Sequence, residues 1–237
     1  MNAYEQKVRI ETEIWKKKIL KKPGMFNRFA KKTQTKINEK IPEKVHEIIA
    51  SSIKNMIEAV LSGAYLISKK SDFLLSLEER ERVIKEKLET YRKTAVVEGA
   101  GTGAGGILLG LADFPLLLSI KMKFLHDVAA IHNCPLNKRE EKLFLLHVFL
   151  LAFSSYEKKK ETLNKICHWE QLPIDKKEID WQVVQQEYRD YIDLAKMLQL
   201  MPGIGAAVGA YANYKLLDTL GQTAIYAYRI KYFQRIS

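Results

Sequence analysis

Histidine and cysteine side chains lie close together at two places in the chain and supply the atoms that zinc prefers. His132 and Cys134 are separated by one residue, and Cys167 and His168 are adjacent. A structural zinc site takes four such nitrogen or sulfur ligands in a tetrahedron. These spacings match no established zinc module, and the chain has no Cys-x-x-Cys pair. We therefore expect no metal and interpret these side chains as ordinary buried or surface residues.

The run from Gly101 to Gly106 matches G-x-G-x-x-G, the pattern of dinucleotide-binding loops. That mechanism needs a strand, a tight turn and a helix within a parallel sheet. Here residues 78–92 have the pattern of a charged helix instead, and no Walker G-K-[ST] or G-x-S-x-G motif occurs. The sequence therefore predicts no cofactor and no catalytic residue.

Three polar residues lie in or near the glycine-rich segments. Asp113 and Asn213 each follow an alanine and precede an aromatic residue, and Glu98 precedes the first glycine. In one interpretation Asp113 and Asn213 face each other as a buried polar pair, with Glu98 near the entrance of the first glycine-rich segment, and the three residues form a candidate polar site. In the other, which we favour, each caps the helix that follows, since Asp before Pro115 is a common N-terminal pair.

Nine of the twelve glycines lie in two stretches about one hundred residues apart. Many are four residues apart, a spacing that lets another helix approach the backbone closely. Each glycine inside a helix costs about 0.5–1 kcal/mol relative to alanine, so such a cluster needs a compensating contact or marks a break. The predicted close-packing glycines are Gly99, Gly101, Gly103, Gly105, Gly106, Gly110, Gly203, Gly205 and Gly209.

Basic residues are concentrated in an N-terminal arm, residues 1–44. This arm has thirteen Lys or Arg against five Glu, a surplus of eight within a net charge of +11. Tyr4, Val8, Trp15 and Ile19 recur at helical spacing beside the lysines, which predicts a basic amphipathic helix suited to an anionic membrane. An equally open alternative is a solvated helix that covers the rest of the bundle. The predicted membrane-surface residues are Trp15, Lys16, Lys17, Lys18, Lys21 and Lys22.

Helical periodicity dominates the chain and strand alternation is nearly absent, so we predict an all-α protein. We expect a single multi-helix bundle, in which residues 45–237 form a core with two pseudo-repeated Gly-rich helical hairpins, near 83–132 and 183–235, packed together. Capping boxes are expected where Ser76 precedes Glu79 and where Asn137 precedes Glu140.

Two segments approach the roughly 20 apolar residues that a membrane-spanning helix requires. Asp113 and Pro115 interrupt the segment 99–120, and polar residues dilute the segment 197–214. Shallow insertion or peripheral association is therefore favoured over full insertion. The N-terminus has no apolar signal core, which predicts a cytoplasmic location. The chain is basic, but it contains no sequence motif of a nucleic-acid-binding protein, so nucleic acid is not an expected partner.

Three segments together resemble the EcsC protein family, and the resemblance extends over nearly the whole chain. They are the helix from Tyr4-Glu5 to Trp15, the run Gly99–Gly110 leading into Ala112-Asp113-Phe114-Pro115, and Glu187-Tyr188-Arg189 through Met201-Pro202-Gly203-Ile204-Gly205-Ala206 to Asn213. The family takes its name from a gene neighbourhood that encodes an ABC-transporter ATPase and its membrane subunit. The resemblance implies no catalytic residues.

The combined expectation is a non-enzymatic, membrane-associated protein on the cytoplasmic side, accessory to an ABC transporter. Its expected partners are an anionic membrane surface or the membrane-protein subunits of that transporter. The alternative is a hydrolase, or a helical protein that binds a small ligand or lipid at Asp113 and Asn213.

Overall fold

The computed structural model describes residues 1–21, 43–64, 75–103, 114–199 and 205–236. Within those ranges every regular element is helical and no strand occurs, which confirms the all-α prediction. The elements in chain order are α1 (Ala3–Ile19), α3 (Glu43–Ser62), α4 (Leu77–Gly103), α6 (Phe114–Ile131), α7 (Arg139–Phe153), α8 (Tyr156–Cys167), the 3-10 turn η1 (Trp169–Gln171), α9 (Ile174–Lys177), α10 (Trp181–Gln199) and α11 (Gly205–Ile236).

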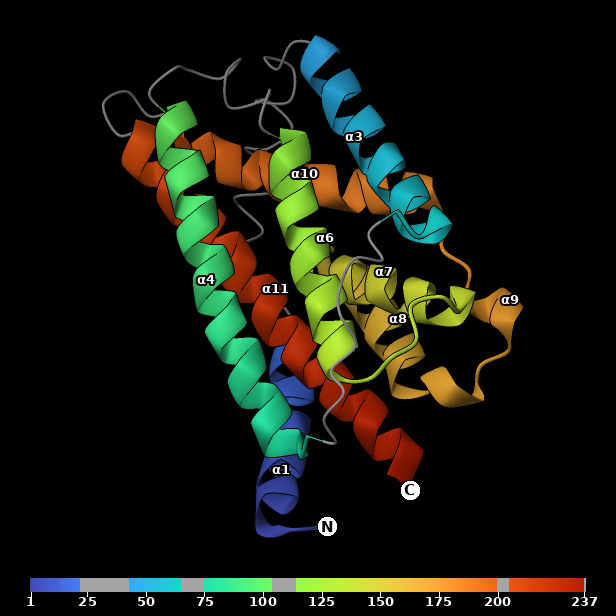
Figure 1. Cartoon of the computed structure of the whole chain (residues 1–237). Coiled ribbons are helices and arrows are strands. Elements are labelled where there is room, and N and C mark those ends of the chain that lie inside the picture. The colour runs from blue at the N-terminus through green and yellow to red at the C-terminus, as the bar shows by residue number, and fades with distance from the viewer. Residues whose placement is uncertain (22–42, 65–74, 104–113, 200–204, 237) are drawn as a thin grey trace.

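The frame of the bundle is built from α4, α6 and α11. Figure 1 shows α4 and α6 side by side in front of the long α11, with both ends of the chain at the lower side. Asn213 of α11 donates a hydrogen bond to the Ala95 carbonyl of α4 at 3.4 Å. Lys87 of α4 pairs with Asp127 of α6 at 2.9 Å. The glycine-rich part of α4 therefore lies in the half of that helix that packs along the N-terminal half of α11.

The centre of the molecule is α7, in which every residue from 141 to 153 is buried. A helix that is apolar on all sides must be surrounded by other elements, and α7 contacts α3, α8, α9, α10 and α11. Its buried Lys142 is satisfied because Nζ donates to the Leu61 carbonyl at 2.8 Å. This apolar run is thus the core of a helical bundle.

Aromatic rings join α6, α7 and α10. Tyr188 of α10 is fully buried, and its ring centroid lies 4.7 Å from that of Phe149, 5.1 Å from Phe153 and 6.1 Å from Phe114. Rings at such distances add about 0.5–1.5 kcal/mol per pair beyond the burial of their area. This cluster fixes α10 across the bundle.

Of the two capping boxes predicted from the sequence, one is present in the structure. Ser76 and Glu79 exchange the expected bonds, with the Ser76 backbone N–H donating to Glu79 Oε2 at 2.8 Å and the Glu79 N–H to Ser76 Oγ at 3.3 Å. The box at Asn137 and Glu140 is wrong, since α7 starts after Lys138 without a side-chain cap. Asn2 and Glu5 form a third box, which starts α1.

The two pseudo-repeated hairpins are not confirmed. The predicted repeat aligns Asp113 of the first unit with Asn213 of the second. In the first unit α6 begins at Phe114, whereas in the second α11 runs without a break from Gly205 through Asn213 to its end. Asn213 therefore lies inside a helix, and its predicted capping role is wrong. Asp113 lies outside the described residues.

A search of the described helices finds none that combines the length and the apolar character needed to cross a bilayer. Much of the segments 99–120 and 197–214 belongs to α4, α6, α10 and α11, with residues 104–113 and 200–204 outside the described part.

Candidate functional site

The outer side of α1 combines exposed isoleucines with exposed lysines. Ile10 and Ile14 are 63% and 62% exposed and lie one helical turn apart. Four exposed lysines follow the same three- and four-residue spacing, so they share this side of the helix, and the last of them lies in the turn after it. We call this surface the α1 face, and it consists of Lys7, Ile10, Ile14, Lys17, Lys18 and Lys21.

The α1 face carries positive charge without a neighbouring free carboxylate. In α1, which the structure describes from end to end, Glu13 is the one exposed acidic residue, and it is paired with Lys16 at 2.7 Å. Lys17 and Lys18 lie in the last turn of the helix, where the carbonyl end of the helix dipole favours cations. Lys22, also predicted at the membrane surface, lies outside the described residues.

The inner side of α1 holds the helix against the bundle. Val8 and Thr12 are buried, at 1% and 2% exposure, and the Trp15 ring stacks on Tyr226 of α11 with centroids 4.7 Å apart and planes 9° apart. Trp15 is therefore a packing residue between two helices. The predicted apolar face of Tyr4, Val8, Trp15 and Ile19 points toward the protein, and the alternative of a helix that covers the bundle describes this side of α1.

Buried charges fix the position of α1 more firmly. The guanidinium of Arg229 donates two hydrogen bonds to Glu81, at 2.6 and 2.7 Å, and a third to Glu11 of α1 at 3.0 Å. Tyr4 of α1 donates to the same Glu81 at 2.8 Å. A guanidinium that donates two charge-assisted hydrogen bonds to one carboxylate fixes the relative orientation of the two side chains. Because α1 is held on this side, its opposite side points directly to solvent.

Tyr232 and Glu5 add another link between the two ends of the chain. Tyr232 of α11 donates to Glu5 Oε1 at 2.7 Å, and this bond lowers the pKa of Glu5 below its usual range. Tyr156 of α8 donates to the Leu20 carbonyl at 3.1 Å, which holds the other end of α1. The α1 face is therefore presented on a helix that is anchored at both of its ends.

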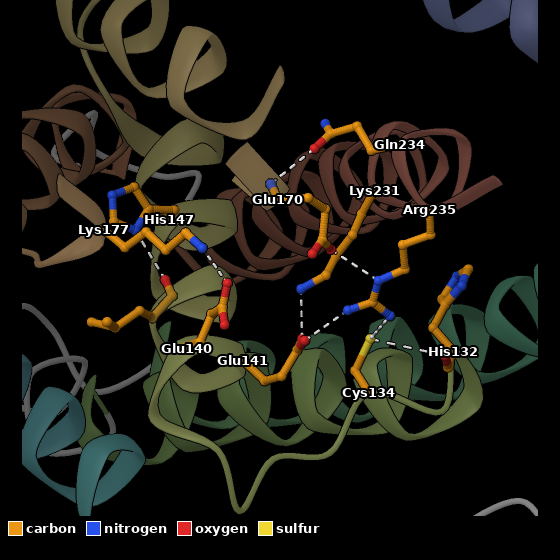
Figure 2. A network of polar contacts seen from close by, with 11 residues as sticks. His132, Cys134, Glu140, Glu141, His147, Glu170, Lys177, Lys231, Gln234 and Arg235 are labelled. Atoms are coloured by element: carbon orange, nitrogen blue, oxygen red, sulfur yellow. Dashed lines mark hydrogen bonds and ion pairs between the residues drawn. The ribbon is translucent and has the colours of Figure 1, made fainter. Parts of the chain in front are cut away.

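A second polar network lies at the C-terminal end of α11 (Figure 2). Lys231 and Arg235 both reach the buried carboxylate of Glu141, at 2.6 and 2.8 Å, and Arg235 also pairs with Glu170 at 2.9 Å. Lys231 Nζ lies 4.1 Å from the centroid of the Phe144 ring. Every charge in this cluster has a partner, so the arrangement is that of a structural clamp between α7, η1 and α11.

The histidine and cysteine pairs do not form a metal site in the part of the chain that the structure describes, where no three metal-ligating side chains come together. His132 stacks on Tyr228 with centroids 4.8 Å apart, and burial, with help from nearby cations, lowers the pKa of His132 to about 3. Cys134 Sγ lies 3.8 Å from Arg235 Nη1 in the Glu141 cluster. Both side chains are buried.

Cys134 is expected to be chemically inert in the folded protein. Burial and the charge of Glu141 raise the pKa of its thiol to about 11, so that only about 0.1% is thiolate at pH 8. In brief treatment with iodoacetamide, mass spectrometry should show Cys134 unmodified in the native protein and fully modified in urea. Equal rates in both states would contradict this assignment.

The predicted polar site is represented by one described side chain. Asn213 is buried, and its amide nitrogen donates to a backbone carbonyl of α4, so it joins two helices. Asp113 and the side chain of Glu98 lie outside the described residues. The pairing of Asp113 with Asn213 therefore stays a prediction.

Some of the predicted close-packing glycines lie in described helices, and the others lie outside the described residues. Gly99, Gly101 and Gly103 lie in α4, and Gly205 and Gly209 in α11, whereas Gly105, Gly106, Gly110 and Gly203 lie outside the described residues. The described glycine in closest contact is Gly221, which the sequence analysis missed. A methyl group there would overlap the side chain of Leu88 of α4, so α4 and α11 do approach closely at a glycine.

The comparison with known proteins decides the family. The model of the EcsC protein family matches residues 6–233. The chain belongs to the EcsC protein family. Protein EcsC of Bacillus subtilis (strain 168) is 50% identical over 218 residues, which cover 92% of this chain and 91% of that protein.

A more distant relative matches a smaller part of the chain. The uncharacterized protein YdbA of Bacillus subtilis (strain 168) is 26% identical over 211 residues, 77% of this chain and 78% of its own length. No solved structure matches the chain. The EcsC family match includes α1 from Gln6 onward, so the helix with the basic and isoleucine surface lies within the family domain.

Sequence reasoning found Lys17, Lys18 and Lys21 of the α1 face but missed Lys7, Ile10 and Ile14. The apolar side of the helix was correctly located, and the second apolar pair on the opposite side was not considered. The signal was present, because Ile10 and Ile14 are four residues apart and both fall among lysines.

Proposed function

We propose that this protein is a non-enzymatic accessory that docks on the cytoplasmic face of an anionic membrane through the α1 face. The observation that carries the proposal is the pair of exposed isoleucines set among exposed lysines on a firmly anchored helix. Interfacial helices combine these two elements, since cations attract lipid head groups and apolar side chains enter the acyl boundary.

The expected strength is that of reversible docking. Each lysine near an anionic surface contributes about 1 kcal/mol, so the four lysines supply roughly 4 kcal/mol at physiological salt. Each isoleucine is already more than a third buried and adds about 1–2 kcal/mol on insertion. The electrostatic share falls with ionic strength, because it is screened within a Debye length.

The membrane partner in this proposal is the transport machinery. Membership of the EcsC family supports it, because the family name refers to a gene neighbourhood with an ABC-transporter ATPase and membrane subunit. A protein held at the lipid surface by α1 meets such a subunit in two dimensions, which raises its effective concentration. The buried amide of Asn213 gives no support to the alternative of a hydrolytic site there.

Vesicle binding tests this proposal directly. The protein should sediment with phosphatidylcholine vesicles that contain phosphatidylglycerol and not with vesicles of phosphatidylcholine alone. The triple variant Lys17→Glu, Lys18→Glu, Lys21→Glu should bind the anionic vesicles at least about tenfold more weakly, because roughly 1 kcal/mol is lost per lysine. The variant Ile10→Ser, Ile14→Ser should lose the binding that persists at high salt.

The matched control makes the same charge changes elsewhere. Lys85, Lys123 and Lys160 are exposed on α4, α6 and α8, and their replacement by Glu should reduce vesicle binding much less. If both triple variants weaken binding equally, net charge alone is responsible and the α1 face is not the docking surface.

A further inference from the structure

A small cavity lies between α7, α8 and the segment that joins α9 to α10, the region at the right of Figure 1. Its volume is about 130 Å³, enough for a ligand of a few heavy atoms. Leu150 and Val183 form part of an apolar wall. The ionisable residues in the lining are His147, Lys158, Glu161, Lys165, Glu178 and Asp180.

His147 supplies a hydrogen-bond acceptor to this cavity. Its side chain is 2% exposed, and Figure 2 shows it on α7, apart from the Glu141 cluster. Nδ1 lies 2.9 Å from the Leu143 carbonyl, a pure acceptor, so Nδ1 carries the proton and Nε2 keeps its lone pair. Among the described residues Nε2 has no hydrogen-bond partner. Nε2 is not among the fully buried polar atoms without a partner, so it is open to the cavity, where a ligand or water can satisfy it.

The charge state of His147 suits that role. Burial lowers its pKa to about 4, and the neighbouring Lys165 and Lys158 lower it while Glu161 opposes them. The ring is therefore neutral at physiological pH. Its Nε2 can accept a hydrogen bond, and the ring has no second N–H that could donate to an anion.

The carboxylates of the lining outnumber its lysines by three to two. Both lysines are tied to one acid, since Lys158 pairs with Glu161 at 2.8 Å and Lys165 with the same group at 3.8 Å. Glu178 is held from outside by Arg139 through two bonds of 2.7 and 2.8 Å.

Asp180 is the third carboxylate of the cavity lining. Its Oδ1 accepts from the Gln182 backbone N–H at 2.8 Å, and no cation of the described chain forms an ion pair with it. Lys158, Lys165 and Arg139 together balance the three carboxylates, and Asp180, which is exposed, is the carboxylate without an ion pair among the described residues. The cavity thus combines a carboxylate that has no ion pair with a neutral nitrogen acceptor, next to an apolar wall. A cation that carries both N–H donors and a short hydrocarbon part matches all three features.

We propose that the His147 cavity binds a small organic ammonium ion, with an N–H bond to His147 Nε2 and charge pairing to Asp180. A carboxylate or phosphate ligand fits less well, because the two lysines already share Glu161 and the histidine is neutral. This inference does not depend on membrane docking by the α1 face, which lies on a different helix.

Nuclear magnetic resonance of the histidine ring nitrogens, with the full chain and ethylammonium chloride as the probe, tests the proposal. Ethylammonium should shift the His147 Nε2 resonance and saturate in the millimolar range, the affinity that a ligand of a few heavy atoms reaches. Ethanol and sodium propionate, which match its size, should leave that resonance unchanged. A shift with propionate, or none with ethylammonium, would overturn the proposal.

The variant Asp180→Asn removes the charge and keeps an oxygen that can accept from Gln182. It should bind ethylammonium at least about fivefold more weakly, whereas Asp175→Asn, an exposed carboxylate of α9 outside the cavity, should bind normally. Equal affinity in both variants would refute the role of Asp180. Free ethanolamine and phosphatidylethanolamine vesicles then distinguish a soluble amine from a lipid head group as the source of the same ammonium chemistry.

Discussion

Replacing Glu81 with Ala is expected to lower the free energy of unfolding by roughly 3–5 kcal/mol, a large part of the stability of a domain of this size. Glu81 is 1% exposed and holds both prongs of the Arg229 guanidinium, which is itself 4% exposed. Without it a buried cation keeps only Glu11, and Tyr4 loses its acceptor. Urea unfolding followed by circular dichroism measures the effect.

The exposed Glu86 of the same helix is the control, and Glu86→Ala should change stability by less than about 0.5 kcal/mol. The double variant Glu81→Met, Arg229→Met should recover much of the loss, because well-packed apolar side chains often replace a buried ion pair at little cost. If Glu81→Ala were as mild as Glu86→Ala, the network would not be what holds α1 to α4 and α11.

This pair also shows why part of the structure could not be predicted from the sequence. Helix class, the Ser76 start of α4 and the inner side of α1 follow from local spacing, which one helical turn is enough to reveal. Glu81 and Arg229 are 148 residues apart. Nothing in the spacing of either residue indicates the other, so a charged residue that is buried by a distant partner looks like one on a solvated surface.

The glycines illustrate a related difficulty. Their clustering drew attention to residues 99–110 and 203–209, whereas the described close contact involves the isolated Gly221 and Leu88. Close approach of two helices depends on which faces meet, and one glycine at the contact suffices. The offset of one hundred residues likewise aligned Asp113 with Asn213, although α11 continues through Asn213 as an unbroken helix.

The cavity at His147 was not found from the sequence for the same reason. His147 lies on α7, Glu161 on α8 and Asp180 just before α10, and none of these residues forms a local motif with another. The sequence analysis did not single out this histidine, which is buried in the folded protein. Only the packing of α7 against α8 shows that one of its ring nitrogens has no partner.

Replacing Lys121 with Met is expected to stabilise the protein by roughly 2–4 kcal/mol near neutral pH. Lys121 is 3% exposed, and among the described residues its Nζ donates only to the Leu117 carbonyl at 3.3 Å. Burial lowers its pKa from 10.5 to about 7, and no described carboxylate opposes that shift. Methionine has a similar length and no charge to bury, so the core keeps its volume.

The pH dependence gives the effect a signature that packing alone cannot imitate. Because the folded pKa is the lower one, the unfolded chain binds more protons between about pH 7 and 10.5, and the stability of the native protein rises with pH across that window. The advantage of Lys121→Met should therefore shrink to about 1 kcal/mol by roughly pH 9.5, since about one unit of the pKa difference then remains. Lys123→Met, on the exposed side of the same helix, should show neither effect. A gain that stays constant with pH would mean that Lys121 is charged in the folded protein and that the benefit of methionine comes from packing.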